Sequence, residues 1–380
     1  MNKLKKIIHI KKKIVIFSVG RSDLSILNNL ITKIDKHPKL NLDLVICGAH
    51  YSYKFGMFKN EFKLNKNNIH YFKIKYQASE NQDILNYFTK HLYFCNKLFN
   101  KKKYDAAIIM GDRYEMLAVA IACLNYQIPI MHFCGGSITS GSLDNIYRYC
   151  ISKIAKAHFV ETQNHKKNLN DFGILKNIFI VGAPALENFK KNLITKKQLE
   201  KKFKINLDKN YMICTFHPET TATKKENINK LIELIKFLNG SKYFIVFTYP
   251  NADQGFKNFI SIIKKKLNLK NVLLTKNLGR INYYSFLKHS NLIIGNSSSG
   301  IIESASFKKP TINLGNRQKE RYCMKNVIHS DFDHKKIKKA FARSQSKKFL
   351  ASIKKIKNKY EKKNTSANSI KIINKILKND

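Results

Sequence analysis

Closely spaced cysteine pairs of the CxxC type are absent from this sequence. It contains seven cysteines, an odd number, and no CxxC pair occurs among them. The spacing argues against a metal site or a disulfide framework, and a reducing compartment suits such a chain best. We therefore expect a cytoplasmic protein without a metal ion.

Long hydrophobic runs are missing as well. The apolar stretch 14–19 is too short to span a bilayer, and Gly20 and Arg21 follow it in place of a small-residue cleavage site. We interpret this stretch as a first β-strand and expect no membrane attachment. Near the other end, 347–380 has the apolar spacing of one or two amphipathic helices that pack back on the body.

Acidic residues are also scarce. The sequence has 25 of them against 71 basic residues, which gives a formal charge of +46. Because nearly all of the basic residues are lysines spread along the whole chain, we interpret the charge as a solvated surface. We expect no specific nucleic-acid partner, and weak, nonspecific binding to polyanions is the alternative.

Arginines are few, but their positions are informative. Five of the seven lie in or beside turns that contain Gly or Asp: Arg21, Arg113, Arg148, Arg317 and Arg321. A planar guanidinium suits diphosphate and carboxylate groups better than an ammonium does. These arginines are therefore candidates for binding an anionic ligand.

Short apolar segments alternate with longer amphipathic ones, and the pattern occurs twice. Predicted strands are 14–18, 42–46, 106–110, 128–133 and 158–161, then 211–216, 243–248, 272–274, 291–294 and 311–314. Apolar strands separated by helices indicate parallel sheets covered on both faces. We predict two α/β domains, 1–187 and 188–361, with the C-terminal helix 362–380 completing the first.

A small, hydroxyl-rich turn follows the strand 291–294. Residues 295–303 read GNSSSGIIE and join that strand to a predicted helix. Glycine lets backbone N–H groups approach an anion, the helix N-terminus adds partial positive charge, and the serine hydroxyls are further donors. We predict that this turn binds a phosphate and that Glu303, about one turn into the helix, binds a ribose diol.

Other polar motifs also follow predicted strands, at 20–23, 48–50, 111–113, 134–137, 217–219 and 250–253. Parallel α/β sheets bind ligands at the edge formed by the carboxyl ends of their strands. Two such edges that face each other would enclose a ligand between the domains.

Four longer motifs occur in a fixed order: GDRYEMLA at 111–118, TFHPET at 215–220, GNSSSGIIE at 295–303 and NLGNRQKER at 313–321. With them, nearly the whole chain resembles the UDP-N-acetylglucosamine 2-epimerase family, specifically its hydrolysing branch in sialic and related nonulosonic acid synthesis. The resemblance implies two Rossmann-like domains in the GT-B arrangement, with UDP held mainly by the second. It also implies a UDP-sugar substrate, no cofactor, and a homo-oligomer, either a dimer or a tetramer.

The resemblance also implies binding roles for individual residues. Matched to family positions that contact UDP are Arg21, Ser25, Arg113, Asn251, Ser297, Ser298, Glu303 and Arg317. Further candidates for substrate binding are His50, Ser137, Arg148, Ser299, Gly300 and Arg321.

The family reaction removes the proton at C2 of a UDP-N-acetylhexosamine and expels UDP from C1. The hydrolysing branch then hydrates the 2-acetamidoglucal to the free, C2-inverted sugar. In this chain the resemblance assigns the proton transfers to Asp112, Asp144 and His217. Asp144 and Arg148, spaced i and i+4, share one helix face.

The chain departs from the family pattern at two positions where carboxylates are usual, which here are Ser137 and Asn145; Cys134 and Tyr149 differ too. Serine and asparagine cannot act as unaided general bases at neutral pH. The remaining acids and His217 would then do all the proton transfers, or the altered pocket takes another sugar, such as a diacetamido-trideoxyhexose instead of N-acetylglucosamine. A UDP-sugar glycosyltransferase and a catalytically decayed UDP-sugar-binding protein are the alternatives.

Overall fold

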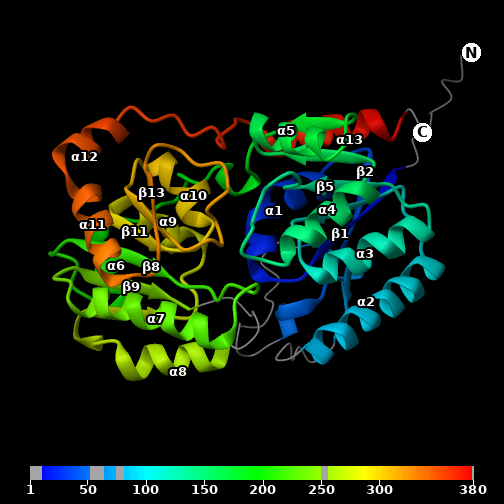
Figure 1. Cartoon of the computed structure of the whole chain (residues 1–380). Coiled ribbons are helices and arrows are strands. Elements are labelled where there is room, and N and C mark those ends of the chain that lie inside the picture. Colours follow the sequence, from blue (N-terminus) through cyan, green and yellow to red (C-terminus); the bar gives the residue numbers. More distant parts are fainter. Residues whose placement is uncertain (1–10, 52–63, 74–80, 250–255, 379–380) are drawn as a thin grey trace, which may run out of the picture.

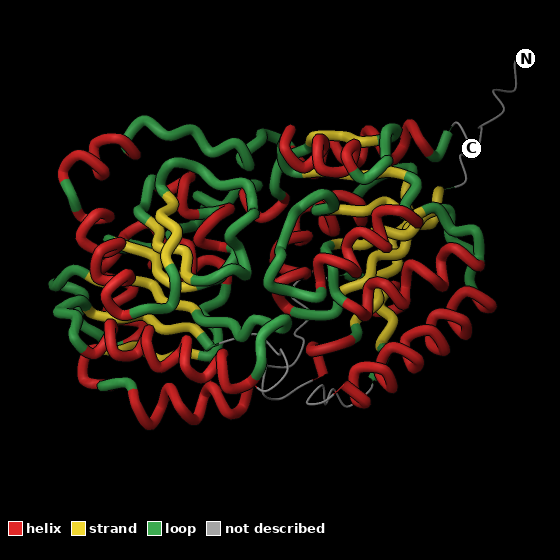
Figure 2. The backbone as a smooth tube through the Cα atoms, in the orientation of Figure 1, coloured by secondary structure: helices red, strands yellow, loops and turns green. Residues whose placement is uncertain are grey.

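The computed structural model describes residues 11–51, 64–73, 81–249 and 256–378. Within these residues the chain forms two parallel sheets, one in each half, with helices on both faces of each (Figures 1 and 2). No helix in the described ranges is long and apolar enough to cross a membrane.

The first sheet has seven strands in the order β3-β2-β1-β4-β5-β6-β7. Its strands are β1 (Lys12–Ser18), β2 (Leu40–Ile46), β3 (Ile69–Tyr71), β4 (Ala106–Met110), β5 (Ile130–Phe133), β6 (Ala157–Val160) and β7 (Ile178–Ile180). The helices between them are α1 (Arg21–Asp35), α2 (Asn81–Lys101), α3 (Tyr114–Asn125), α4 (Asp144–Ile154) and α5 (Gln163–Asp171). Every neighbouring pair is parallel, so all carboxyl ends meet at one edge.

The second sheet has six parallel strands in the order β10-β9-β8-β11-β12-β13. Its strands are β8 (Tyr211–Thr215), β9 (Phe244–Thr248), β10 (Val272–Thr275), β11 (Leu292–Gly295), β12 (Thr311–Leu314) and β13 (Val327–Ser330). The helices of this half are α6 (Lys196–Phe203), α7 (Lys224–Asn239), α8 (Phe256–Lys266), α9 (Arg280–His289), α10 (Ser299–Ile302), α11 (His334–Gln345) and α12 (Lys347–Ile353).

Strand β1 shows why these segments are apolar throughout. Ile14 and Ile16 pack into the core layer that contains side chains of α1, whereas Val15 and Phe17 pack into the opposite layer with side chains of α2 and α3. Successive side chains of a strand point to opposite faces, so a sheet covered on both faces needs hydrophobic residues at every position. The two-domain α/β architecture predicted from the sequence is confirmed.

The end of the chain returns to the first half. After α12 the chain crosses over, and helix α13 (Thr365–Ile376) packs on α1, with Ile370 and Ile373 in the first core (Figure 1). The Thr365 hydroxyl donates a 2.8 Å hydrogen bond to the carbonyl oxygen of Val181. These contacts fix the crossover against the first sheet, as expected for amphipathic helices at this end.

Candidate active site

Asp112 and Arg148 are brought together at the edge of the first sheet. Asp112 follows β4, and the Arg148 side chain from α4, only 2% exposed, forms an ion pair with it. The guanidinium also donates to the Ser137 carbonyl at 2.5 Å and to the Thr139 hydroxyl at 3.1 Å. Arg148 therefore ties the loop after β5 to the carboxylate after β4.

Arg113 has a carboxylate partner beside it on the chain. Its Nε lies 3.0 Å from one oxygen of the buried Glu115, and its Nη2 lies 3.2 Å from the other. This two-point pair orients the guanidinium at the start of α3. A contact of Arg113 with UDP stays a prediction.

His132 lies in β5 directly behind this loop and is fully buried. Its Nε2 is 2.9 Å from the Gly111 carbonyl oxygen, so Nε2 donates, and its Nδ1 accepts from the Ser152 hydroxyl at 3.1 Å. Burial lowers the pKa of His132 to about 4. The neutral ring thus braces the strand end that carries Asp112.

Folding stability should depend on pH through His132. The unfolded chain protonates this histidine near pH 6.5 and the folded chain only near 4, so its contribution is complete above 6.5 and is lost as the pH falls toward 4. The loss amounts to about 3 kcal/mol. Urea unfolding of wild type and His132→Gln at pH 7 and pH 4.5 measures this loss. The difference in the free energy of unfolding between the two proteins should be smaller at pH 4.5 than at pH 7. A constant difference would show that His132 is not held neutral.

His217 and Asn296 join two predicted motifs in the second half. The Asn296 side chain accepts from the His217 backbone N–H and donates to the His217 carbonyl, both at 2.7 Å. One motif follows β8 and the other follows β11, and these strands are neighbours. The reciprocal pair therefore fixes the His217 loop against the serine-rich turn, as expected from their common sheet edge.

Glu219 orders the third loop of this edge. One of its oxygens accepts from the backbone N–H groups of Asn316 and Arg317, at 2.8 and 3.1 Å, and the other lies 2.6 Å from the Lys230 ammonium. The Arg317 side chain donates to the Asn296 carbonyl oxygen at 3.3 Å. Arg317 is thereby positioned beside the serine-rich turn. Glu219 belongs to the predicted motif 215–220, but this positioning role was not predicted for it.

The helix after the serine-rich turn is shorter than predicted. Helix α10 spans one turn, and Glu303 is the residue that ends it, followed by a 3-10 turn at Ser304–Phe307. So short a helix has little dipole, because the dipole sums over aligned peptide units. Phosphate binding here would therefore depend on the serine hydroxyls and backbone amides of 297–300.

The Glu303 carboxylate is held in place from two sides. One oxygen accepts from the Ser299 hydroxyl at 2.5 Å, and the other accepts from the Tyr284 hydroxyl at 3.2 Å. Burial raises the pKa of Glu303. Tyr283 also bonds to Ser299, so α9 holds both Ser299 and Glu303.

Gly295 is needed where β11 enters this turn. Its φ is +132°, and a Cβ there would lie 1.9 Å from the carbonyl oxygen of Thr215 in the adjacent strand. Gly295→Ala should therefore lower the free energy of unfolding by about 3 kcal/mol. The matched control is Gly240→Ala, where φ is −83° and the nearest atom is 3.7 Å away. Equal unfolding midpoints in urea for both variants would refute the expected clash.

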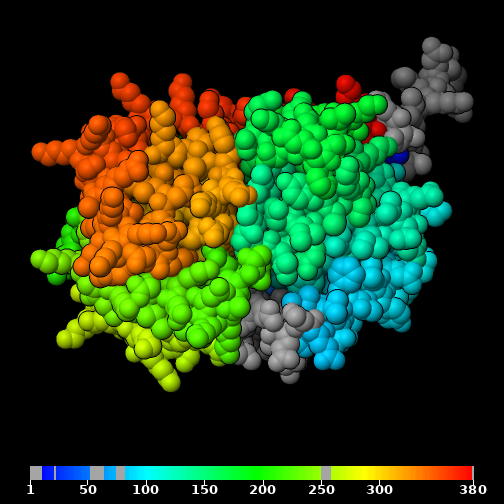
Figure 3. All heavy atoms as spheres, in the orientation of Figure 1, coloured from blue at the N-terminus to red at the C-terminus, as the bar shows by residue number. Residues whose placement is uncertain are grey.

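The edges of the two sheets face each other and touch. The Leu143 backbone N–H donates a 3.0 Å hydrogen bond to the Thr220 hydroxyl, and the Ser140 hydroxyl bonds to Glu320. A Cβ on Gly141 would lie 2.8 Å from the Cα of Arg317. Figure 3 shows the two halves in contact along this seam. The loop between β5 and α4, to which Arg148 is bonded, and the Arg317 loop therefore meet between the halves.

The remaining predicted site residues are engaged in local contacts, are partly buried on a helix, or lie outside the residues that the structure describes. His50 is fully buried, and its Nε2 is 2.9 Å from the Ser18 hydroxyl, while Ser25 is half-buried on α1. Asp144 begins α4 and accepts from the Ser142 hydroxyl at 2.8 Å. The side chain of Arg21 and the whole of Asn251 lie outside the described residues.

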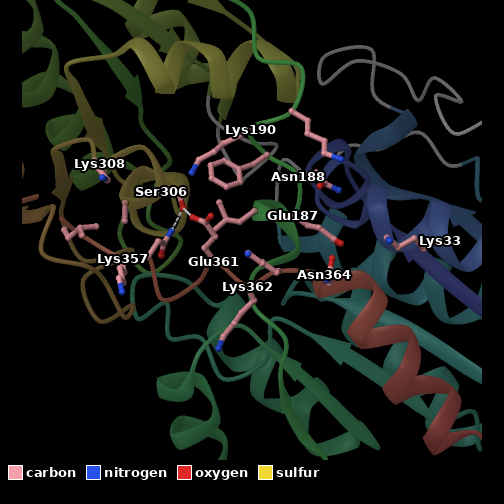
Figure 4. A pocket seen from close by; sticks show the side chains of 17 residues that line it. Lys33, Glu187, Asn188, Lys190, Ser306, Lys308, Lys357, Glu361, Lys362 and Asn364 are labelled. Atoms are coloured by element: carbon pink, nitrogen blue, oxygen red, sulfur yellow. Dashed lines mark hydrogen bonds between the residues drawn. The ribbon is translucent and has the colours of Figure 1, made fainter. Parts of the chain in front are cut away.

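A cavity of about 800 Å³ lies elsewhere, where the linker 186–191 and the crossover 356–364 pass each other (Figure 4). Seven of its 17 lining residues are lysines: Lys33, Lys190, Lys191, Lys308, Lys357, Lys362 and Lys363. None of the predicted site residues that the structure describes lines it. It extends the basic surface and is separate from the facing sheet edges.

Two facing parallel α/β domains, with a Gly-Ser turn on one edge and an Asp-Arg pair on the other, define a protein of GT-B type. The chain belongs to the UDP-N-acetylglucosamine 2-epimerase family, whose model matches residues 32–374. It is 36% identical over 351 residues to the hydrolysing GDP/UDP-N,N'-diacetylbacillosamine 2-epimerase of Campylobacter jejuni, covering 89% of each chain. It is 32% identical to the polysialic acid biosynthesis protein P7 of Escherichia coli, covering 97% of this chain and 95% of that one.

Solved structures show the same fold. The UDP-GlcNAc 2-epimerase of Neisseria meningitidis bound to UDP-GlcNAc superposes with a TM-score of 0.79 at 17% identity, covering 97% of this chain and 100% of that one. The enzyme of Methanocaldococcus jannaschii, in complex with UDP-GlcNAc and UDP, gives 0.77 at 21% identity, covering 96% and 99%. The predicted GT-B arrangement is confirmed.

Proposed function

We propose that this protein is a hydrolysing UDP-HexNAc 2-epimerase that releases UDP and a free, C2-inverted sugar. The observation that carries the proposal is the contact of the two sheet edges, in which the loop between β5 and α4, bonded to Arg148, meets the loop that carries Arg317. The names of the Campylobacter relative and of a Legionella pneumophila relative, UDP-N,N'-diacetylbacillosamine 2-epimerase (hydrolyzing), support a UDP-diacetamido-trideoxyhexose as substrate. UDP-N-acetylglucosamine is the second candidate substrate.

The side chains divide into two sets in this proposal. Ser297, Ser298 and Arg317 bind the diphosphate, and Glu303 accepts hydrogen bonds from the ribose diol. Negative charge moves onto a phosphate oxygen as the bond at C1 breaks, and the guanidinium of Arg317 and a protonated His217 would stabilise it. In this assignment Asp112 and Asp144, on the opposite edge, transfer protons at the sugar.

The remaining assignments follow the family. We propose domain limits of 1–187 and 188–361 with 362–380 joining the first, a cytoplasmic location, and a dimer or tetramer that needs no cofactor. The return of α13 to α1 supports the assignment of the last helix to the first domain.

A substrate panel tests the activity. UDP release and free-sugar formation should be measured with UDP-2,4-diacetamido-2,4,6-trideoxyhexose and with UDP-N-acetylglucosamine, and we expect faster turnover of the first. UDP release that requires an added sugar acceptor would indicate a glycosyltransferase instead. Tight UDP binding in calorimetry with no turnover of either compound would indicate a binding protein.

A further inference from the structure

Glu161 is a buried carboxylate to which the sequence analysis assigns no function. It follows β6 directly and is 4% exposed. One oxygen accepts a 3.8 Å hydrogen bond from the Cys134 thiol, and the other lies 3.5 Å from Nδ1 of His165 without a hydrogen bond. Among the described residues this second oxygen has no hydrogen-bond partner.

Several buried polar atoms around Glu161 also lack a hydrogen-bond partner among the described residues. Within the described part of the chain, no hydrogen bond reaches the Ser137 hydroxyl, either ring nitrogen of His165, or Nε of Arg321. Leaving a buried donor or acceptor unpaired costs about 1–3 kcal/mol each, so native proteins rarely tolerate a group of them without a ligand or water. This group therefore has the character of a polar binding pocket.

The backbone brings these residues together. A Cβ on Gly136 would lie 2.2 Å from the carbonyl oxygen of His165, so the loop before Ser137 packs directly on α5. The Asn168 side chain also donates to the Gly136 carbonyl at 2.7 Å. Arg321 enters from the second half, in the loop after β12. The pocket is thus built from both facing edges, like the rest of the site.

Charge within this pocket suits proton transfer. Burial raises the pKa of Glu161, and the positive charges of Arg321 and Arg148 oppose that rise. Burial also lowers the pKa of His165 to about 3, so its ring stays neutral. The titratable and charged groups that act on Glu161 or contact it are Cys134, Arg148, His165, Glu303, Arg321 and Tyr360. A carboxylate with a raised pKa is a better proton acceptor than one paired to arginine, as Asp112 is.

We propose that Glu161 is a further acid–base residue of the 2-epimerase reaction, acting on the sugar in the pocket that it shares with Ser137, His165 and Arg321. Strands β4, β5 and β6 are neighbours, so Glu161 stands two strands from Asp112 on the same edge. It supplies a carboxylate on the edge where Ser137 stands at a position that is usually a carboxylate in the family. The inference rests on the proposed function and adds a residue to it.

The step that Glu161 performs is the elimination. The C2–H bond breaks and its proton passes to the Glu161 carboxylate. The electron pair of that bond becomes the C1=C2 double bond, and the C1–O bond breaks with its pair, which leaves on UDP. Hydration later adds water oxygen to C1 and returns a proton to C2.

The test compares Glu161→Gln, which keeps the shape of the side chain, with wild type. We expect kcat to fall by about 100-fold or more, with an unchanged Kd for UDP in calorimetry. Wild-type kcat/KM should fall as acid protonates the carboxylate, and this acid limb should vanish in the glutamine variant and shift in Glu161→Asp. The matched control is Glu187→Gln, a buried carboxylate bonded to Ser366, which should keep wild-type kcat and pH profile.

Three results would overturn the inference while leaving the proposed function intact: a Glu161→Gln enzyme with wild-type kcat, one that is slow but keeps the acid limb, or a folded Glu161→Asp enzyme with an unshifted limb. The last of these decides the matter if the glutamine variant does not fold. Wild-type protein that releases no UDP from either candidate sugar would refute the proposed function, and this inference with it.

Discussion

Replacing Arg148 by methionine is expected to reduce turnover by roughly 100–1000-fold and the free energy of unfolding by about 3–5 kcal/mol. The guanidinium is buried and bonded at once to the carboxylate after β4 and to the loop after β5. Methionine fills similar volume but leaves Asp112 without its charged partner and frees the Ser137 loop. Single-turnover kinetics and urea unfolding measure the two effects.

An exposed arginine is the matched control for this change. Arg343 lies on α11 over the ring of Phe349, and Arg343→Met should change neither quantity by a measurable amount. Arg148→Lys keeps the positive charge but not the planar, two-pronged guanidinium. We expect its turnover and its free energy of unfolding to lie between those of Arg148→Met and wild type. Wild-type kcat and stability in Arg148→Met would show that the pair with Asp112 does not organise the site.

Replacing Glu303 by glutamine should weaken UDP binding by about 10–100-fold, because hydrogen bonds to a charged acceptor contribute about 1.5–3 kcal/mol. The carboxylate is already oriented by Ser299 and Tyr284, so the change removes charge with little rearrangement. Calorimetry with UDP measures the loss.

Binding of a second nucleotide, 2'-deoxy-UDP, tests whether Glu303 contacts the ribose. Wild type should bind UDP more tightly than 2'-deoxy-UDP, and the glutamine variant should bind the two nearly equally. Comparing both proteins with both nucleotides forms a double cycle, which isolates the contact of Glu303 with the 2'-hydroxyl. Glu361→Gln is the control, because this exposed carboxylate bonds only to Ser306 in the contacts that the structure shows. An undiminished preference for UDP in Glu303→Gln would contradict a ribose contact.

The interior of both sheets could be predicted from the sequence, but three outer strands could not. The observed bounds of β4 and β12 agree with the prediction, and the other predicted strands differ by one or two residues at one or both ends. The missed strands β3, β7 and β13 lie at sheet edges. Each is three or four residues long. A histidine interrupts the apolar run in β3 and β13, whereas β7 is apolar throughout but only three residues long, and so short an apolar run does not by itself distinguish a strand from other buried structure.

Site residues that lie together in one local motif could be predicted from the sequence. Contacts between side chains that follow different strands could not. The serine-rich turn and Glu303 were identified from consecutive residues. The i, i+4 spacing pointed from Arg148 to Asp144, whereas the structure pairs Arg148 with Asp112, which follows the neighbouring strand β4. No local sequence pattern encodes that pair. Glu161 directly follows β6, and an acid at the carboxyl end of an apolar strand is the signal in the sequence that points to it.

One measurement tests the central claim most directly, namely turnover of the UDP-sugar in D₂O. Proton removal at C2 followed by hydration predicts release of UDP and a free, C2-inverted sugar carrying one deuterium at C2. Free sugar with hydrogen at C2 and retained C2 configuration would indicate simple hydrolysis of the bond at C1. That result would contradict an epimerase in which the facing edges abstract the C2 proton and expel UDP together.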